Sequence, residues 1–209
     1  MSARRRLNLE TIPGLLATGT LAGLLLSSAA IAVWLVARPR AGVVPAPRAT
    51  TAADAVTAEA RMASAGELRD RHLDFPVEGI PRERLTDTFD EPRSGHVHEA
   101  SDILAPRNTP VRAVEAGTIA RLLQNPSGGI TVYQLDPEGR YVYYYAHLER
   151  YADGLKEGQK VDRGQVIGYV GTSGNAPRST PHLHFAIFKV VDQRQWWGGA
   201  PINPYLVLR

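Results

Sequence analysis

The sequence predicts an all-β domain, an antiparallel sandwich or partly open barrel, that runs from Phe75 to Arg209 of the 209-residue chain. Short β-prone runs recur after Phe75, and clusters of Gly, Pro, Asn and Asp separate them. No convincing amphipathic helix interrupts the runs, apart from a possible helical turn around residues 148–155. The predicted strands cover residues 111–114, 117–123, 130–135, 141–146, 166–170 and 182–191.

The N-terminal part of the chain predicts a membrane anchor. Residues 1–10 form a short basic segment, and residues 11–37 contain no charged side chain. Within them, the stretch from Leu15 to Val36 is long enough as a helix to cross roughly 30 Å of hydrocarbon. It is also longer than the apolar core of a typical signal peptide. We therefore expect a single transmembrane helix at residues 11–37, with cleavage at a small-residue site such as Ala30-Ile31-Ala32 as the alternative.

The segment at residues 38–74 is predicted to be a linker. It is rich in Ala, Pro, Thr and Arg, a composition typical of a flexible tether. Helix-forming residues become frequent from Ala52 toward Leu68, so part of this tether is expected to be helical. Such a tether would let the β domain reach away from a membrane.

Charge and cysteine content exclude several classes of function. The chain has a net charge of +3 and a pI of about 9.3, but from Gly66 onward 17 Lys and Arg face 18 Asp and Glu. The basic surplus belongs to the N-terminal region, so the domain is not expected to bind nucleic acid. The absence of cysteine excludes disulfides, thiolate nucleophiles and thiolate zinc sites.

The stretch Pro181-His182-Leu183-His184-Phe185 predicts one wall of a metal site. Side chains two apart on a strand share a face, so His182 and His184 project together while Leu183 and Phe185 point into the core. Two histidines on one face can divide the work, one holding a metal and the other meeting a substrate.

Two further motifs supply the remaining groups. His98 lies four residues before Asp102, and His147 ends the run Tyr145-Ala146-His147. Together the chain offers one carboxylate and two histidines as ligands, with two histidines left over. Two His and one carboxylate, with a fourth position open, is a known ligand set for catalytic zinc. Zinc activates water and polarises a carbonyl, and histidine can manage the proton or the oxyanion.

These three motifs, in this order, closely resemble the signature of the lysostaphin-type (LytM-domain) zinc metalloendopeptidases, which are peptidoglycan hydrolases. The resemblance covers Phe75 to Arg209 and implies the duplicated hybrid-motif type of β fold. It also implies a Zn²⁺ cofactor and the cross-link peptides of peptidoglycan as substrate. Residue by residue, it implies zinc ligation by His98, Asp102 and His184, and catalytic roles for His147 and His182 beside the reactive water and the scissile carbonyl.

The resemblance further implies a location. A wall substrate requires the peptidase domain to lie on the periplasmic, extracytoplasmic side of the bacterial inner membrane, with residues 11–37 as the single-pass anchor. The sequence itself names no protein partner.

Some residues near the motifs depart from the family pattern or compete with the assigned ones. Ala100 and Asn108 stand where relatives often have Gly. His96 is an extra histidine two residues before His98, but only His98 has the four-residue spacing to Asp102. Glu99 is expected to point away from the site. Two further residues, Arg93 and Asn175, lie on loops that could border a substrate groove.

Two hypotheses from other functional classes are considered as alternatives. A non-catalytic LytM-like wall factor would bind and activate another hydrolase, but such relatives lack one or more of the five site residues, all of which are filled here. A swinging-arm carrier module would need a lysine at a hairpin tip, and none of Lys156, Lys160 and Lys189 lies at one. Trp196-Trp197 is either an exposed sugar platform or a packed terminal loop, and packing is favoured.

Overall fold

The computed structural model describes residues 52–93 and 95–209. The predicted anchor at residues 11–37 and the basic segment at residues 1–10 lie outside the described residues, as do residues 38–51 of the linker. Within the described ranges, no helix is both long and apolar enough to cross a bilayer.

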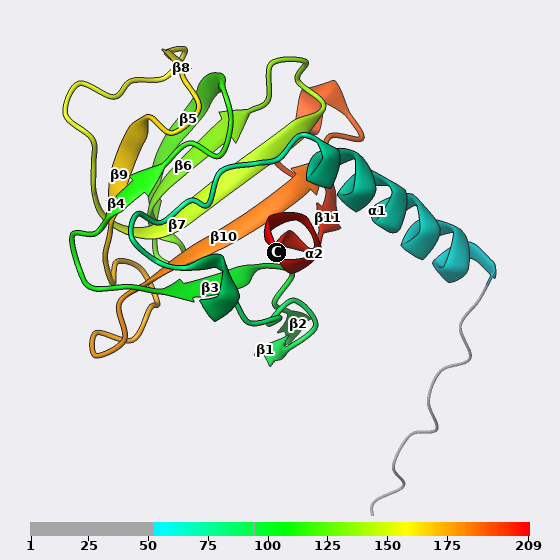
Figure 1. Ribbon diagram of the computed structural model, residues 1–209, viewed down its shortest axis with the longest axis horizontal. Helices are drawn as coiled ribbons and strands as arrows, with labels where there is room; N and C mark the ends of the chain where they lie inside the picture. Colours follow the sequence, from blue (N-terminus) through cyan, green and yellow to red (C-terminus); the bar gives the residue numbers. More distant parts are fainter. Residues whose placement is uncertain (1–51, 94) are drawn as a thin grey trace, which may run out of the picture. The chain divides into compact units, whose positions relative to one another are not determined.

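The described chain is predominantly antiparallel β-structure, with two α-helices, α1 (Ala52–Asp70) and α2 (Pro204–Leu208), and two short 3-10 turns, η1 (Arg82–Arg84) and η2 (Gln193–Gln195) (Figure 1). The strands are β1 (Pro92–Arg93), β2 (His96–Val97), β3 (Ser101–Leu104), β4 (Pro110–Arg112), β5 (Gly117–Asn125), β6 (Gly129–Leu135), β7 (Tyr141–Tyr151), β8 (Lys160–Val161), β9 (Val166–Val170), β10 (His182–Lys189) and β11 (Ala200–Ile202).

Nine of these strands form one sheet, in the order β11-β10-β7-β6-β5-β8, with β3 paired to β10, β4 to β9 and β9 to β7. β1 and β2 form a separate hairpin. The long strand β7 organises the sheet, because its first half pairs with β6 and β10 while its end pairs with β9. The possible helical turn at residues 148–155 is therefore wrong in its first half, where β7 continues as a strand to Tyr151.

The core forms where the predicted strands bury alternate side chains. On β10, Leu183, Phe185 and Ile187 are fully buried and point away from the two histidines. On β7, Tyr141, Tyr143 and Tyr145 are also fully buried. The hydroxyl of Tyr145 donates to Gln134 at 2.8 Å, so these large aromatic residues enter the core without losing their polar partners.

Helix α1 belongs to the folded domain rather than to a free tether. The helix expected from Ala52 toward Leu68 is present, but its Ala65 and Leu68 side chains lie in the hydrophobic core together with Leu73. The packed structure thus begins before the predicted boundary at Phe75. The reason is that the C-terminal half of α1 carries small and apolar residues on the side that meets β11 and α2.

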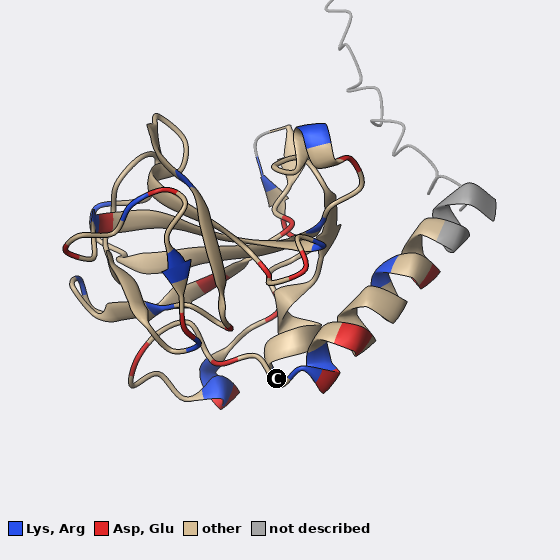
Figure 2. Ribbon diagram, turned by 90° about the horizontal axis from the view of Figure 1, so that it is seen from above, with Lys and Arg blue, Asp and Glu red and all other residues tan. Residues whose placement is uncertain are grey.

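The surface of the domain carries both signs of charge. Figure 2 shows Lys and Arg interspersed with Asp and Glu along the ribbon. Near η2, Trp197 is 49% exposed, so the packed-loop interpretation is wrong for this residue. Trp196 is only partly exposed and packs edge-on against Tyr133, with ring centroids 5.8 Å apart.

Candidate metal centre

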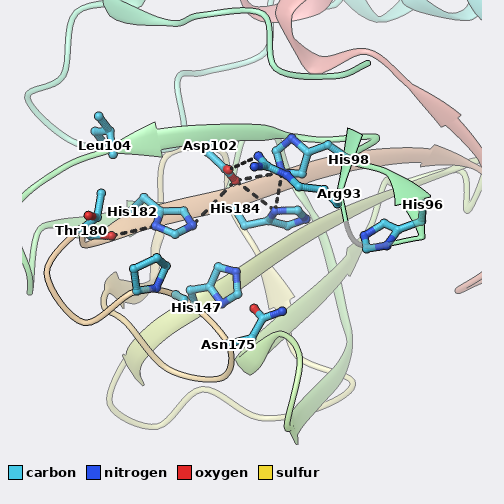
Figure 3. Close-up of a pocket in the computed structure, with 12 residues that line it drawn as sticks. Arg93, His96, His98, Asp102, Leu104, His147, Asn175, Thr180, His182 and His184 are labelled. Carbon is cyan, nitrogen blue, oxygen red and sulfur yellow. Dashed lines mark hydrogen bonds and ion pairs between the residues drawn. The ribbon is translucent and has the colours of Figure 1, made fainter. Parts of the chain in front are cut away.

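The register of three strands brings the predicted site residues together. On β10, His184 lies opposite Asp102 of β3 on one side and opposite Ala146 of β7 on the other. His147 follows Ala146 directly, and His182 stands two residues before His184 on the same face. Figure 3 shows these side chains converging from different elements on one pocket.

Three ligand atoms form a nearly equilateral triangle. The distance from His98 Nε2 to Asp102 Oδ1 is 3.1 Å, as is the distance from His98 Nε2 to His184 Nδ1. The third side, from His184 Nδ1 to Asp102 Oδ1, is also 3.1 Å. Within the described residues these three form the group that could hold a metal ion.

The triangle fits zinc. Protein nitrogen and oxygen ligands lie about 2.0–2.2 Å from Zn²⁺ in tetrahedral geometry, so two ligand atoms should be about 3.3 Å apart. The three separations of 3.1 Å are close to that edge length. A carboxylate oxygen carries no hydrogen and each neutral imidazole carries one, so the cluster directs more lone pairs at its centre than hydrogens. A cation satisfies such a centre better than mutual hydrogen bonds.

Thr88 fixes the first ligand and the loop that carries it. The Nδ1 of His98 donates to the Thr88 carbonyl at 2.9 Å, which leaves Nε2 as the ligand atom. The Thr88 hydroxyl donates to the Ala100 carbonyl at 3.2 Å and lies 3.4 Å from the Asp102 backbone nitrogen. Thr88 thus contacts both ends of the His98–Asp102 segment, the His98 ring at one end and the Asp102 backbone at the other.

The environment keeps the ligands in the state that binds metal. Burial raises the pKa of Asp102, but hydrogen bonds and charges from His184 and His98 outweigh it and hold that pKa well below its usual range. Burial lowers the pKa of His184, although Asp102 opposes the shift. A carboxylate and a neutral imidazole therefore persist at neutral pH, and both are the ionisation states that coordinate zinc.

A β-bulge aims His147 at the site. The register between β6 and β7 shifts between Ile130 and Val132, so that β7 carries an extra residue where His147 lies. His147 has a φ of 59°, in the left-handed region that non-glycine residues seldom adopt. Bulges and such strained residues commonly re-aim a side chain beside an active site.

Backbone carbonyls orient both catalytic candidates. The Nδ1 of His147 donates to the Ser173 carbonyl, and the Nδ1 of His182 donates to the Thr180 carbonyl, both at 2.9 Å. Each ring therefore keeps Nε2 for the pocket, and the two ring centroids are 4.9 Å apart. Burial lowers the pKa of His147 to about 4, despite the Ser173 carbonyl, so this imidazole is neutral at pH 7.

The loop that carries Ser173 is held by close backbone packing. A side chain at Gly174 would meet the backbone nitrogen of Gly129 at 2.3 Å, and both residues have positive φ. The Ser173 hydroxyl donates to the Leu148 carbonyl at 2.6 Å. The loop and the bulge of β7 thus form one tightly packed support for His147.

The site opens into a pocket of about 440 Å³. Besides the five predicted residues, it is lined by Arg93, His96, Leu104, Asn175, Ala176, Pro177 and Thr180. Arg93 and Asn175 therefore border the pocket, as expected, and His96 lines it without joining the ligand triangle. Glu99 does not line the pocket, in agreement with its expected outward position.

Arg93 also contacts a ligand directly. Its Nη2 lies 2.9 Å from Asp102 Oδ2, the carboxylate oxygen that the triangle does not use, and 3.2 Å from Glu91. This contact leaves Oδ1 as the oxygen that faces the two histidines. The sequence placed Arg93 near the groove but assigned it no contact.

Ala100 and Asn108, which stand where relatives often have glycine, both fit the local structure. Asn108 has a φ of 68°, and asparagine is among the non-glycine residues that tolerate this region best. Ala100 is fully buried, and its carbonyl accepts from Thr88. Sequence reasoning missed Thr88, Ser173 and Thr180, because the histidines use their backbone carbonyls, which leave no mark on residue identity.

Comparison with known proteins places this constellation in a peptidase family. The family model described as "Peptidase family M23" matches residues 96–204, which include all five predicted site residues. The L-Ala–D-Glu endopeptidase of Bacillus subtilis is 34% identical over 151 residues, which cover 66% of this chain and 45% of that protein. Lysostaphin of Staphylococcus simulans is 33% identical over 93 residues, which cover 44% of this chain and 18% of that protein.

A solved structure gives the same picture of the fold. A candidate glycyl-glycine endopeptidase, LytM, from Ruminococcus gnavus superposes with a TM-score of 0.54 at 27% identity, over 66% of this chain and 60% of that one. This chain spans less than half the length of the curated relatives named above.

Proposed function

The chain belongs to peptidase family M23, and we propose that it is a zinc-dependent endopeptidase that cleaves the cross-link peptides of peptidoglycan. The observation that carries the proposal is the triangle of His98, Asp102 and His184, with sides of 3.1 Å, beside two further histidines that keep Nε2 for the same pocket. A purely structural histidine cluster has no need for two such additional rings.

The residues divide into those that hold a metal and those that handle a proton. His98, Asp102 and His184 would hold zinc, and Thr88 and Arg93 orient two of them. When bound, zinc supplies Lewis acidity, which activates water for attack on an amide carbonyl.

His147 is suited to accept a proton, since it is neutral at pH 7 and its Nε2 is not bound by the backbone. The proton that it takes up can pass to the leaving amine. His182 lies beside it, with Nε2 3.8 Å from Asp102 Oδ1. When protonated, either ring can donate to the oxyanion that develops on the scissile carbonyl.

The relatives support a peptide of the cell wall as substrate. The names of the matching proteins from Bacillus subtilis and Vibrio cholerae describe an L-Ala–D-Glu endopeptidase and peptidoglycan DD-endopeptidases. The pocket of about 440 Å³ is open and bordered by Arg93, Asn175 and Leu104, so an extended peptide can lie across it.

The test is zinc content together with release of cross-link peptides from purified peptidoglycan by the full-length chain. We expect one zinc per chain and release of peptides, both lost in Asp102→Asn, which keeps the size of the side chain. Bound zinc without cleavage, but with stimulation of another wall hydrolase, would support the non-catalytic alternative. A folded wild-type protein that binds no zinc would refute the metal site.

We further propose that residues 11–37 anchor the chain in the bacterial inner membrane, with the peptidase domain on the periplasmic side. The support is the long uncharged stretch in the sequence and the extracytoplasmic position of the proposed substrate. Membrane fractionation and protease treatment of spheroplasts test this arrangement. A shortened, soluble protein would show that the segment is instead cleaved.

A further inference from the structure

A second pocket lies next to the candidate metal pocket. It has a volume of about 340 Å³ and is lined by Arg107, Glu149, Thr172, Ser173, Gly174, Ala176 and Arg178. Ala176 lines both pockets, so the loop at residues 171–181 separates them.

Arg107 is held in a fixed orientation in the second pocket. Its Nε and Nη1 face Glu149 at 3.4 and 3.5 Å, and its Nη2 donates to the Thr172 hydroxyl at 2.5 Å. A guanidinium has five N–H donors, so these contacts leave two of them for a ligand. The pairing also compensates the charge of Glu149, which alone would repel an anion.

Arg178 supplies the excess positive charge. Within the described part of the chain, it has neither an ion pair nor a side-chain hydrogen bond, and it is exposed on the loop. The pocket therefore carries one compensated and one uncompensated guanidinium. A planar anion is the ligand that such groups bind best, because a carboxylate accepts two parallel N–H bonds.

We propose that this second pocket is a carboxylate-binding subsite, in which Arg178 and Arg107 bind a free carboxylate of the peptide substrate. The proposal rests on the proposed function, since the subsite serves a peptide held at the metal centre. A peptide substrate that carries a free carboxylate can present it to this pocket while its scissile amide lies at the metal centre.

The subsite and the catalytic pocket share adjacent residues of one loop. Thr172, which accepts from Arg107, is followed directly by Ser173, whose carbonyl accepts from His147 Nδ1. In Figure 3, Asn175 of the same loop lies beside His147 in the metal pocket. A carboxylate held by Arg107 and Arg178 would therefore fix the substrate against the loop that also orients His147.

The experiment uses two synthetic cross-linked stem peptides of one sequence, with the carboxylates either free or converted to carboxamides. Binding to the zinc-loaded full chain is measured by calorimetry in a His147→Ala background, so that the peptide is not consumed. The same titrations are made with Arg178→Ala and with the matched control Arg194→Ala. Arg194 is an exposed arginine on η2, beyond the opposite end of β10 from His182.

We expect the free carboxylate peptide to bind about five- to tenfold tighter than the carboxamide, as for a charge-assisted hydrogen bond in a partly exposed site. Arg178→Ala should remove this preference, Arg178→Glu should reverse it, and Arg194→Ala should leave it unchanged. With His147 restored, Arg178→Ala should raise KM for the carboxylate peptide by a similar factor and leave kcat within about twofold.

Equal binding of the two peptides, or a preference that survives Arg178→Ala, would overturn the subsite. Tighter binding of a glycerol-phosphate oligomer, lost in Arg178→Ala, would assign the pocket to an anionic wall polymer instead of a peptide. Because binding is measured without turnover, failure of the proposed catalytic function would appear separately, as absent zinc or absent cleavage.

Discussion

Two clusters of buried or half-buried ionisable groups within residues 52–93 and 95–209 differ in the kind of hydrogen bonds that they make. At the C-terminal end of α1, Arg71 Nη1 lies 3.1 Å from Glu115 and 3.0 Å from Asp136. Asp136 also accepts from the backbone nitrogens of Arg140 and Tyr141, and the Tyr143 hydroxyl donates to Glu115. In this α1 cluster, the Arg71 guanidinium, the Tyr143 hydroxyl and two backbone N–H groups supply donors to both carboxylates.

The candidate metal centre is the opposite case. Asp102, His98 and His184 each direct one possible ligand atom at the same point, and the Nδ1 donor of His98 is used by the Thr88 carbonyl. The α1 cluster is complete within the protein and stabilises the docking of the helix. We infer that a cation would complete the candidate metal centre, and on that basis the balance of donors and acceptors distinguishes the two clusters.

His147→Ala should have the largest effect on activity. It tests whether His147 handles a proton rather than binding the metal. We expect kcat to fall about 10²- to 10⁴-fold, the usual contribution of a general acid or base, while zinc content stays unchanged. The assays are peptide release and metal analysis. His72→Asn, at an exposed histidine that does not line the site pocket, is the matched control and should keep full activity. Loss of zinc in His147→Ala would place His147 among the ligands.

Arg71→Leu should break the α1 cluster without touching the metal centre. Removing the cation leaves the buried carboxylates of Glu115 and Asp136 without the Arg71 counter-charge, and breaking such a buried pair typically costs about 3–5 kcal/mol. Urea unfolding should therefore show a fall of this size in the free energy of unfolding, with zinc affinity retained. Arg194→Ala, at an exposed arginine, should change that free energy by less than about 0.5 kcal/mol. An unchanged midpoint in Arg71→Leu would mean that the cluster contributes little to stability.

Lowering the pH in the presence of a chelator should destabilise the protein through His147 of the candidate metal centre. The folded-state pKa of His147, about 4, lies below the unfolded value near 6.5, so the unfolded chain binds more protons between these values. The stability contributed by the neutral ring is present above pH 6.5 and is lost as pH falls toward 4, by roughly 1–3 kcal/mol. His147→Gln should flatten this slope in urea titrations, and an equally steep slope would contradict the assignment.

Thr88→Val should have the smallest effect, because it removes orientation without removing a ligand. The hydroxyl contacts to Ala100 and Asp102 are lost, whereas the carbonyl that orients His98 remains. We expect zinc to bind about tenfold more weakly in a chelator competition, the lower end for groups that support a ligand. Thr118→Val, on β5, serves as the control, and equal affinities of the two variants would exclude a positioning role for the Thr88 hydroxyl.

Much of the site could be predicted because its residues carry strong local patterns. The alternation on β10 puts His182 and His184 on one face and Leu183 on the other, and the structure confirms it. The four-residue spacing of His98 and Asp102 likewise indicates two side chains that can meet. The helix from Ala52 was also predictable from composition, but its burial was not, because docking depends on Arg71 meeting carboxylates more than 40 residues away.

The sequence by itself determined the residue types of the metal centre, the antiparallel strands and the division between a near-neutral domain and a basic N-terminal region. Each follows from composition or from periods of two to four residues. Only the tertiary structure decided how His147 is aimed, which carbonyls orient the histidines, and where the folded domain begins. These depend on a bulge, on backbone groups that every residue shares, and on contacts between distant segments, none of which residue identity encodes locally.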